Sequence, residues 1–223
     1  MVKRLVDVVL TAVALVAALP ALALAALGIR LSSPGPVLYR AVRAGRGGRP
    51  FIMLKLRTMH ARRRSDDSVV TAEHDPRVFP FGAFLRRTKL DELPQLFNVL
   101  RGDMAVVGPR PEDPSVVDRY TRDQWETLAV APGLTSPGAL YSTTHGETWL
   151  TGGNPERVYM ERLLPLKLAL DRVYVRRASL RYDLTVIART VGVVAGRALG
   201  RRQFADPPEM TEARRLLEPI EAA

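Results

Sequence analysis

The most pronounced hydrophobic pattern is an apolar run near the start of the chain. The twenty residues from Val8 to Leu27 carry no charge, and they follow a start that contains Lys3 and Arg4. Because a helix rises about 1.5 Å per residue, a run of this length is sufficient to cross the hydrocarbon core of a bilayer. The pattern predicts a hydrophobic membrane helix, which we assign to residues 1–30.

Pro20 lies within this run and leaves its topology open. A proline inside a helix removes a backbone hydrogen bond and bends the helix. A strongly bent helix can enter and leave through one leaflet, with both basic flanks on the cytoplasmic face, whereas a kinked helix spans the bilayer. A cleaved signal peptide is a third interpretation, but its apolar part is usually shorter. A re-entrant helix bent at Pro20 and a spanning helix kinked there therefore both stay open.

Shorter apolar patterns predict a small hairpin after the apolar run. Val37–Tyr39 and Phe51–Leu54 have the character of two strands, and a basic, glycine-rich loop joins them. Lys55, Arg57 and Thr58 follow with strand-like alternation. These three side chains are candidates for phosphate binding, although a solvated face explains them equally well.

Helical periodicity recurs along the rest of the chain. It predicts helices over 79–87 and 115–127 and two helices over 156–194. The second of these two carries bulky apolar residues opposite arginines, which suits either the core or the membrane interface. Residues 132–153 are rich in Gly, Ser, Thr and Pro and are expected to be a loop that governs substrate selectivity.

These elements predict an α/β chain, more closely α+β, that forms one mainly helical domain with a small β-hairpin. At 223 residues it is long enough to bury a substantial core. The expected parts are the hydrophobic membrane helix over 1–30, a main domain over 31–205 that includes amphipathic helices, and a C-terminal tail over 206–223.

The charge balance indicates an anionic partner. The net charge is +10, and no Asp or Glu occurs between Val8 and Ser65, where arginines gather after the apolar run. Such asymmetry beside a hydrophobic segment favours an anionic phospholipid surface. A nucleic-acid-binding module would also be basic, but it would leave the apolar run unexplained, and the aromatics form no stacking platform. The sequence has no cysteine and three histidines, which argues against a zinc site.

The most chemically dense stretch covers residues 88–111, TKLDELPQLFNVLRGDMAVVGPRP. Its apolar residues recur at spacings of three and four: Leu90, Leu93, Leu96, Phe97 and Leu100. This spacing predicts a short helix that packs through an apolar stripe. Because proline is tolerated only in the first turn of a helix, Pro94 places the expected start near Leu90 or Asp91.

Asp91 and Glu92 lie off this stripe, at the expected helix N-terminus. Helix capping alone accounts for many such pairs. The segment Gly-Pro-Arg-Pro at 108–111 favours a further role, because a guanidinium held between two prolines matches phosphate oxygens. Carboxylates beside a phosphate site indicate a metal bridge or a nucleophile. The helix end is also expected to lower the pKa of Asp91 and keep it ionised.

These motifs resemble the bacterial sugar transferase family, the monotopic phosphoglycosyl transferases. The resemblance covers about residues 3–194 and rests on five segments: KRLVDVVL, SPGPVLY, GRPFIMLKLRTM, DPRVFPFGAFLRRTKLDELPQLFNVLRGDMAVVGPRPE and LDRVYVRRASLRYDLTVIARTV. The long central segment is highly specific because it contains so many ordered residues.

The resemblance implies that a sugar 1-phosphate passes from a nucleotide diphosphate sugar, usually a UDP-sugar, to undecaprenyl phosphate at the cytoplasmic face of the bacterial inner membrane. It also implies that the helix over 1–30 is re-entrant, with Pro20 at the bend, and that residues 31–205 form a cytoplasmic catalytic domain with interfacial amphipathic helices. Asp91 matches the family's nucleophile, Glu92 assists it, and both are expected to hold Mg²⁺. Arg86 and Arg110 match family arginines that contact phosphate or lipid head groups. The segment APGLTSPGALY at 131–141 departs from the family pattern. A non-catalytic membrane scaffold that binds sugar nucleotides therefore stays open as an alternative. Assembly into a homo-oligomer is also open, because the sequence does not determine the oligomeric state.

Overall fold

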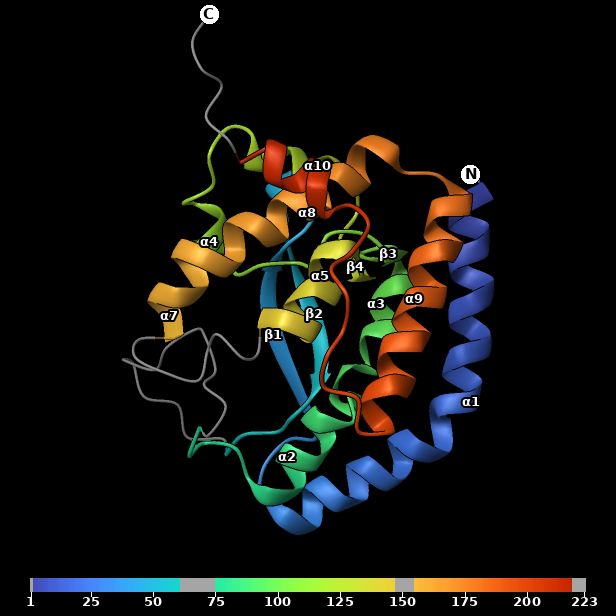
Figure 1. Cartoon of the computed structure of the whole chain (residues 1–223). Helices are drawn as coiled ribbons and strands as arrows, with labels where there is room; N and C mark the ends of the chain where they lie inside the picture. Colours follow the sequence, from blue (N-terminus) through green and yellow to red (C-terminus); the bar gives the residue numbers. More distant parts are fainter. Residues whose placement is uncertain (1, 61–74, 147–154, 218–223) are drawn as a thin grey trace, which may run out of the picture.

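Helices dominate the computed structural model, which describes residues 2–60, 75–146 and 155–217 (Figure 1). The helices are α1 (Val2–Ser32), α2 (Pro80–Arg87), α3 (Gln95–Arg101), α4 (Pro114–Val117), α5 (Pro137–Tyr141), α7 (Pro155–Val158), α8 (Leu164–Arg177), α9 (Leu180–Ala198) and α10 (Met210–Arg215). The strands are β1 (Leu38–Ala44), β2 (Pro50–Leu56), β3 (Ala105–Val107) and β4 (Gly133–Thr135). This architecture confirms the expected mainly helical α+β class with its hairpin.

Helix α1 contains Pro20 and is bent rather than straight. Figure 1 shows its first part running along one side of the molecule and its second part turning beneath α2. The bend follows from the hydrogen bond that the proline cannot make. Among the described residues, α1 is the one helix long and apolar enough to cross a membrane.

Both ends of α1 pack against the rest of the protein. At the start of the helix, the Lys3 ammonium donates to the Val107 carbonyl at 3.1 Å and pairs with Asp183 of α9 at 2.5 Å. Near the other end, Ala25 and Ile29 are buried in one cluster with Leu56, Phe79 and Leu85. Because α1 is bent, both its start and its end contact the rest of the protein.

The hairpin of β1 and β2 is antiparallel, with Ala41 opposite Met53. Its far side is fixed to α3 by Asn98, a buried side chain that accepts from the Leu54 amide at 2.9 Å and donates to the Ile52 carbonyl at 2.7 Å. Because this amide satisfies the backbone of β2, it sets where α3 lies along the strand. The strand and the helix together support the segment that carries Asp91.

A wide apolar surface extends over α1 and α9. Val13 and Val16 of α1 are 67% and 68% exposed, and Val191 of α9 is 64% exposed. Soluble proteins rarely expose so many bulky apolar side chains on neighbouring elements. Of the two alternatives for the basic amphipathic helix, its exposed apolar residues favour the membrane interface over the core.

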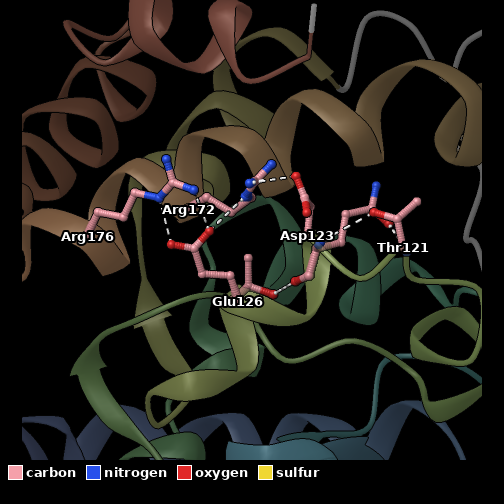
Figure 2. Close-up of polar contacts among 7 residues, drawn as sticks. Thr121, Asp123, Glu126, Arg172 and Arg176 are labelled. Atoms are coloured by element: carbon pink, nitrogen blue, oxygen red, sulfur yellow. Dashed lines mark hydrogen bonds and ion pairs between the residues drawn. The ribbon is translucent and has the colours of Figure 1, made fainter. Parts of the chain in front are cut away.

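Helix α8 is the central core helix, and a polar network holds the segment before β4 against it. Figure 2 shows Arg172 and Arg176 of α8 directed toward Glu126, with Asp123 on the other side of Arg172. Arg176 makes a two-pronged contact with Glu126 at 2.6 and 2.8 Å, and Arg172 reaches Asp123 at 3.0 Å. These contacts fix the chain that returns toward the second sheet.

The expected C-terminal tail is in part a component of the core. Met210 and Ala213 of α10 are buried in the same cluster as Leu170 and Val173 of α8. The sequence contains too short an apolar pattern here to distinguish a docked helix from a solvated one. Part of the expected tail over 206–223, the helix α10, therefore packs against α8.

Two further expectations need correction. The helix predicted over 115–127 is only α4 followed by a 3₁₀ turn at Gln124–Ala129, because the Gln124 side chain accepts from the Thr121 amide and competes with helical pairing. The loop predicted over 132–153 begins instead as β4, α5 and a π-helical turn, Ser142–Gly146. Residues 147–153 lie outside the described ranges.

Candidate active site

Asp91 and Glu92 lie in a 3₁₀ turn, Leu90–Glu92, that directly precedes α3. Lys89 enters this turn with φ of 59°, the one positive φ among the described non-glycine residues. A left-handed backbone at a lysine is unfavourable and is a feature of functional sites. The expected helix start near Leu90 is wrong by several residues, because Pro94 is the residue that caps α3 and the helix itself begins at Gln95.

The predicted apolar stripe packs only in part. Leu96 is buried and Leu90 packs against the cluster of Ala25 and Ile29, whereas Phe97 is 40% exposed. The buried side of the segment also includes polar residues that the apolar spacing does not predict: Asp91, Gln95 and Asn98.

Glu92 and Arg110 form the strongest polar contact at the site. Both guanidinium ends donate to the carboxylate, at 3.0 and 2.7 Å, and the Lys55 ammonium of β2 lies 3.8 Å from the same carboxylate. Although burial alone would raise it, the pKa of Glu92 is lowered on balance by Arg110 and Lys55. Glu92 is consequently an anion held between two cations.

The pKa of Asp91 is shifted in the opposite direction to that of Glu92. Burial, together with the charge of Glu92, raises the pKa of Asp91 above its ordinary value, and Lys55, Lys89 and Arg86 oppose the rise. The expectation that the helix end lowers this pKa is wrong, because the carboxyl group lies in a buried turn before the helix. One of its oxygens, Oδ1, is buried without a hydrogen-bond partner among the described residues.

The other predicted site residues divide into two groups. Lys55, Arg86 and Arg110 contribute charge at Asp91 or Glu92, as the shifts of those carboxyl groups indicate. Arg57 does not join them: its buried guanidinium donates to the Ser33 side chain and carbonyl at 2.8 and 2.7 Å. Arg57 ties the end of α1 to β2. Thr58 lies beside Gly82, where its carbonyl accepts from the Phe79 amide at 3.3 Å.

A second buried charge cluster adjoins Arg110 and was missed in the sequence. Glu112 accepts from the Tyr159 hydroxyl at 2.6 Å and from Lys167 of α8. The pKa of Arg110 is raised mainly by Glu92, and the charge of Glu112 adds to this effect. The sequence signal was the carboxylate two residues after Arg110, but its partners lie 47 and 55 residues further on, and spacing of that kind does not predict contact.

The two adjacent carboxylates supply oxygens of the kind that Mg²⁺ takes as ligands. Mg²⁺ in nucleotide sites takes one or two carboxylates, substrate phosphates and water. Asp91 offers one carboxylate oxygen, and each Glu92 oxygen keeps a lone pair beyond its bond to Arg110. The described part of the chain has no group of three or more Asp, Glu or His suited to a metal. The protein would therefore supply only these two ligands.

Sequence comparison decides the family. The family model for bacterial sugar transferases matches residues 1–197, which is most of the chain. The chain belongs to the bacterial sugar transferase family. The expectation of a transferase is thereby confirmed, and the 88–111 segment with Asp91, Glu92 and Arg110 lies inside the matched region.

Several relatives of this transferase are named for their activities. It is 43% identical over 192 residues to the UDP-glucose:undecaprenyl-phosphate glucose-1-phosphate transferase of Caulobacter vibrioides, covering 85% of this chain and 68% of the relative. It is 37% identical to the protein of the same name from Escherichia coli, with 85% and 39% covered. It is 30% identical to a UDP-N-acetylgalactosamine-undecaprenyl-phosphate N-acetylgalactosaminephosphotransferase of Aeromonas hydrophila, with 86% and 43% covered. The last two relatives are thus more than twice as long as the matched region.

Proposed function

We propose that this sugar transferase moves a sugar 1-phosphate from a UDP-sugar to undecaprenyl phosphate and releases UMP. The three relatives described above, from three genera, have names that specify a UDP-sugar and undecaprenyl phosphate as substrates. The observation that carries the proposal is the buried carboxylate of Asp91, with one unpartnered oxygen, beside the cations Arg110 and Lys55. A buried carboxylate flanked by cations suits attack on a diphosphate.

The chemistry proceeds in two displacements. A carboxylate oxygen of Asp91 forms a bond to the phosphorus that bears the sugar, and the bond from that phosphorus to the bridging oxygen breaks, so UMP leaves with the electron pair. A phosphate oxygen of undecaprenyl phosphate then attacks the same phosphorus. This breaks the acyl phosphate, regenerates the Asp91 carboxylate and yields the lipid diphosphate sugar. Neither step requires a general base, because both nucleophiles are already anions.

Glu92, Arg110 and Lys55 manage the charge in this scheme. Mg²⁺ held by Asp91 and Glu92 would offset the charge of the diphosphate and of the departing UMP. Arg110 keeps Glu92 in place with its two-pronged contact, while Lys55 and Arg86 favour a negative charge near Asp91. Preorganised charges of this kind stabilise the transition state without reorganising during the step.

The most direct test uses the full-length protein in vesicles that contain undecaprenyl phosphate. A panel of labelled UDP-sugars should include at least one from which UMP and a lipid-linked sugar diphosphate form in equal amounts. Binding of a UDP-sugar without release of UMP from any member of the panel would contradict the proposal and favour a non-catalytic scaffold.

The proposed location is the inner membrane, with α1 re-entrant and the catalytic body on the cytoplasmic face. A straight helix of 31 residues would hold its ends about 46 Å apart. Lys3 and Ile29, at opposite ends of α1, both contact the catalytic body. A spanning helix would place one of these ends across the bilayer from the body, so the contacts support the re-entrant arrangement.

Cysteine labelling tests this topology cleanly because the chain has no native cysteine. Val2→Cys reports on the start of α1, and Arg122→Cys reports on an exposed position of the body. Both variants should react with an impermeant maleimide in inverted membrane vesicles and neither in intact cells with a permeable outer membrane. Labelling of position 2 from outside, with position 122 protected, would instead indicate a spanning helix.

The charge of Lys55 should set the alkaline limit of the reaction. Burial, followed by the positive charge of Arg110, lowers the pKa of Lys55 to about 8, although Glu92 opposes the change. The site loses a cation as the pH rises through this value, so the rate at pH 9 should fall by about tenfold. Lys55→Arg should extend activity to higher pH, since an arginine stays charged. Identical alkaline profiles for the two proteins would contradict this assignment.

A further inference from the structure

Gln95 is a fully buried amide whose two polar atoms lack partners. Its exposed fraction is 0%, and neither Oε1 nor Nε2 has a hydrogen-bond partner among the described residues. Buried amides are normally satisfied, because an unpaired polar group in the interior is destabilising. Asn98, one turn further along, has the same chemistry and three partners. The core of this protein can therefore satisfy an amide, and at Gln95 it does not.

The position of Gln95 relates it to Asp91. The backbone at Leu93 and Pro94 is right-handed helical, so the 3₁₀ turn continues into α3 without a break in helical sense. The amides of Leu93, Leu96 and Phe97 donate to carbonyls three residues earlier, so Gln95 follows Asp91 by one 3₁₀ turn and one residue. The two side chains therefore project from neighbouring faces of the same short helical path. Both side chains are buried, and Asp91 Oδ1 is likewise unpartnered. An orphan donor and an orphan acceptor thus lie one turn apart.

We infer that Gln95 positions Asp91 for attack: the amide donates to Asp91 Oδ1 when the donor diphosphate occupies the site, and the other carboxylate oxygen is thereby aimed at phosphorus. The inference rests on the proposed function, since it assigns a partner to the proposed nucleophile. Catalytic hydrogen bonds are often open in a free enzyme and form only in the substrate complex. Gln95 is a positioning residue in this scheme, because it acts through Asp91.

The surroundings leave this role to Gln95. Charged groups face Asp91 from its own turn, from β2, from α2 and from the segment after β3: Glu92, Lys89, Lys55, Arg86 and Arg110. Glu92 is repulsive, and Arg110 is engaged in two bonds to Glu92. The flexible lysines supply charge without a fixed direction. A planar amide one turn along the chain supplies the direction that a carboxylate needs.

The test compares stability and kinetics in the full-length protein. Gln95→Met keeps the length of the side chain and removes both orphan atoms. It should raise Tm by a few degrees, because no satisfied bond is lost, and it should lower kcat for UMP release by about 10- to 100-fold with KM for the UDP-sugar nearly unchanged. Thr11→Val is the matched control. It removes the hydroxyl of Thr11, which is also buried without a hydrogen-bond partner among the described residues, and it should raise Tm with kcat unchanged.

A second variant separates the reach of the donor from its presence. Gln95→Asn keeps an amide donor but shortens its reach by one methylene, so its kcat should be as low as that of Gln95→Met. Wild-type kcat in either variant would overturn the inference. So would a lower Tm or failure of Gln95→Met to fold, since that would mean the amide is already paired in the free protein. Absence of UMP release in the wild-type protein, by contrast, would overturn the proposed function and the inference with it.

Discussion

Asp91→Asn is expected to reduce UMP release from a UDP-sugar by at least about 10³-fold, because the amide cannot attack phosphorus and removal of a nucleophile has effects of this size. Binding of the UDP-sugar should change little. The measurement is single-turnover UMP release at saturating donor, which separates chemistry from product release. Turnover within tenfold of the wild-type rate would exclude Asp91 as the nucleophile.

Stability provides the control for this variant. Because burial raises the pKa of Asp91 in the folded protein, the ionised carboxylate destabilises the fold at neutral pH. This destabilisation develops as the pH rises from the unfolded to the folded pKa. Asp91→Asn removes the buried charge, so its Tm at pH 7 should equal or exceed that of the wild type. A lost activity with a retained Tm is then a chemical effect.

Arg110→Ala is expected to lower kcat by about 10²- to 10³-fold, the usual effect of removing one preorganised charge from a transition state. Stability should also fall, by roughly 1–3 kcal/mol, because Glu92 loses both bonds to the guanidinium. Arg110→Lys should recover little, since an ammonium cannot make the two-pronged contact. The measurements are the same UMP assay and denaturant unfolding.

Arg176→Ala is the matched control for Arg110→Ala. Arg176 also makes a two-pronged contact with a glutamate, Glu126, at 2.6 and 2.8 Å, but it does so between α8 and the segment at 124–129 (Figure 2). Its loss should lower stability and leave kcat near the wild-type value. Equal loss of kcat in the two variants would indicate that Arg110 supports only the fold.

The hairpin, α2 and α8 were predictable because local pattern and tertiary burial agree there. The strands near Val37 and Phe51 follow apolar runs bounded by glycine and proline, and the C-cap of α3 at Gly102 has φ of 96°, as a turn glycine permits. The long apolar helix was predictable from local pattern alone. Its length and lack of charge leave few alternatives.

The candidate site was predictable in composition but not in geometry. Asp91, Glu92 and Arg110 were expected together, and Glu92 does pair with Arg110. The burial of Asp91 was not expected, because an aspartate is ordinarily exposed unless it is paired. The spacing of the neighbouring apolar residues gives no indication that this turn is buried.

Contacts between distant segments lie beyond any local pattern. Arg57 was a candidate for phosphate binding, yet it binds Ser33, 24 residues earlier. Lys3 reaches Asp183 across 180 residues. Strands β3 and β4, of three residues each, pair in parallel although neither has a distinctive sequence. Such pairings depend on the whole fold, and a charged residue in the sequence gives no indication of whether its partner is a substrate or another part of the chain.

The covalent intermediate is the claim on which the proposed mechanism depends most directly. The wild-type protein is mixed with the active UDP-sugar in the absence of undecaprenyl phosphate, quenched, and examined by intact mass and peptide mapping. The expected result is one added sugar 1-phosphate per chain, located on Asp91 and removed when undecaprenyl phosphate is supplied. A full burst of UMP without any adduct, or an adduct on another residue that survives in Asp91→Asn, would contradict the mechanism.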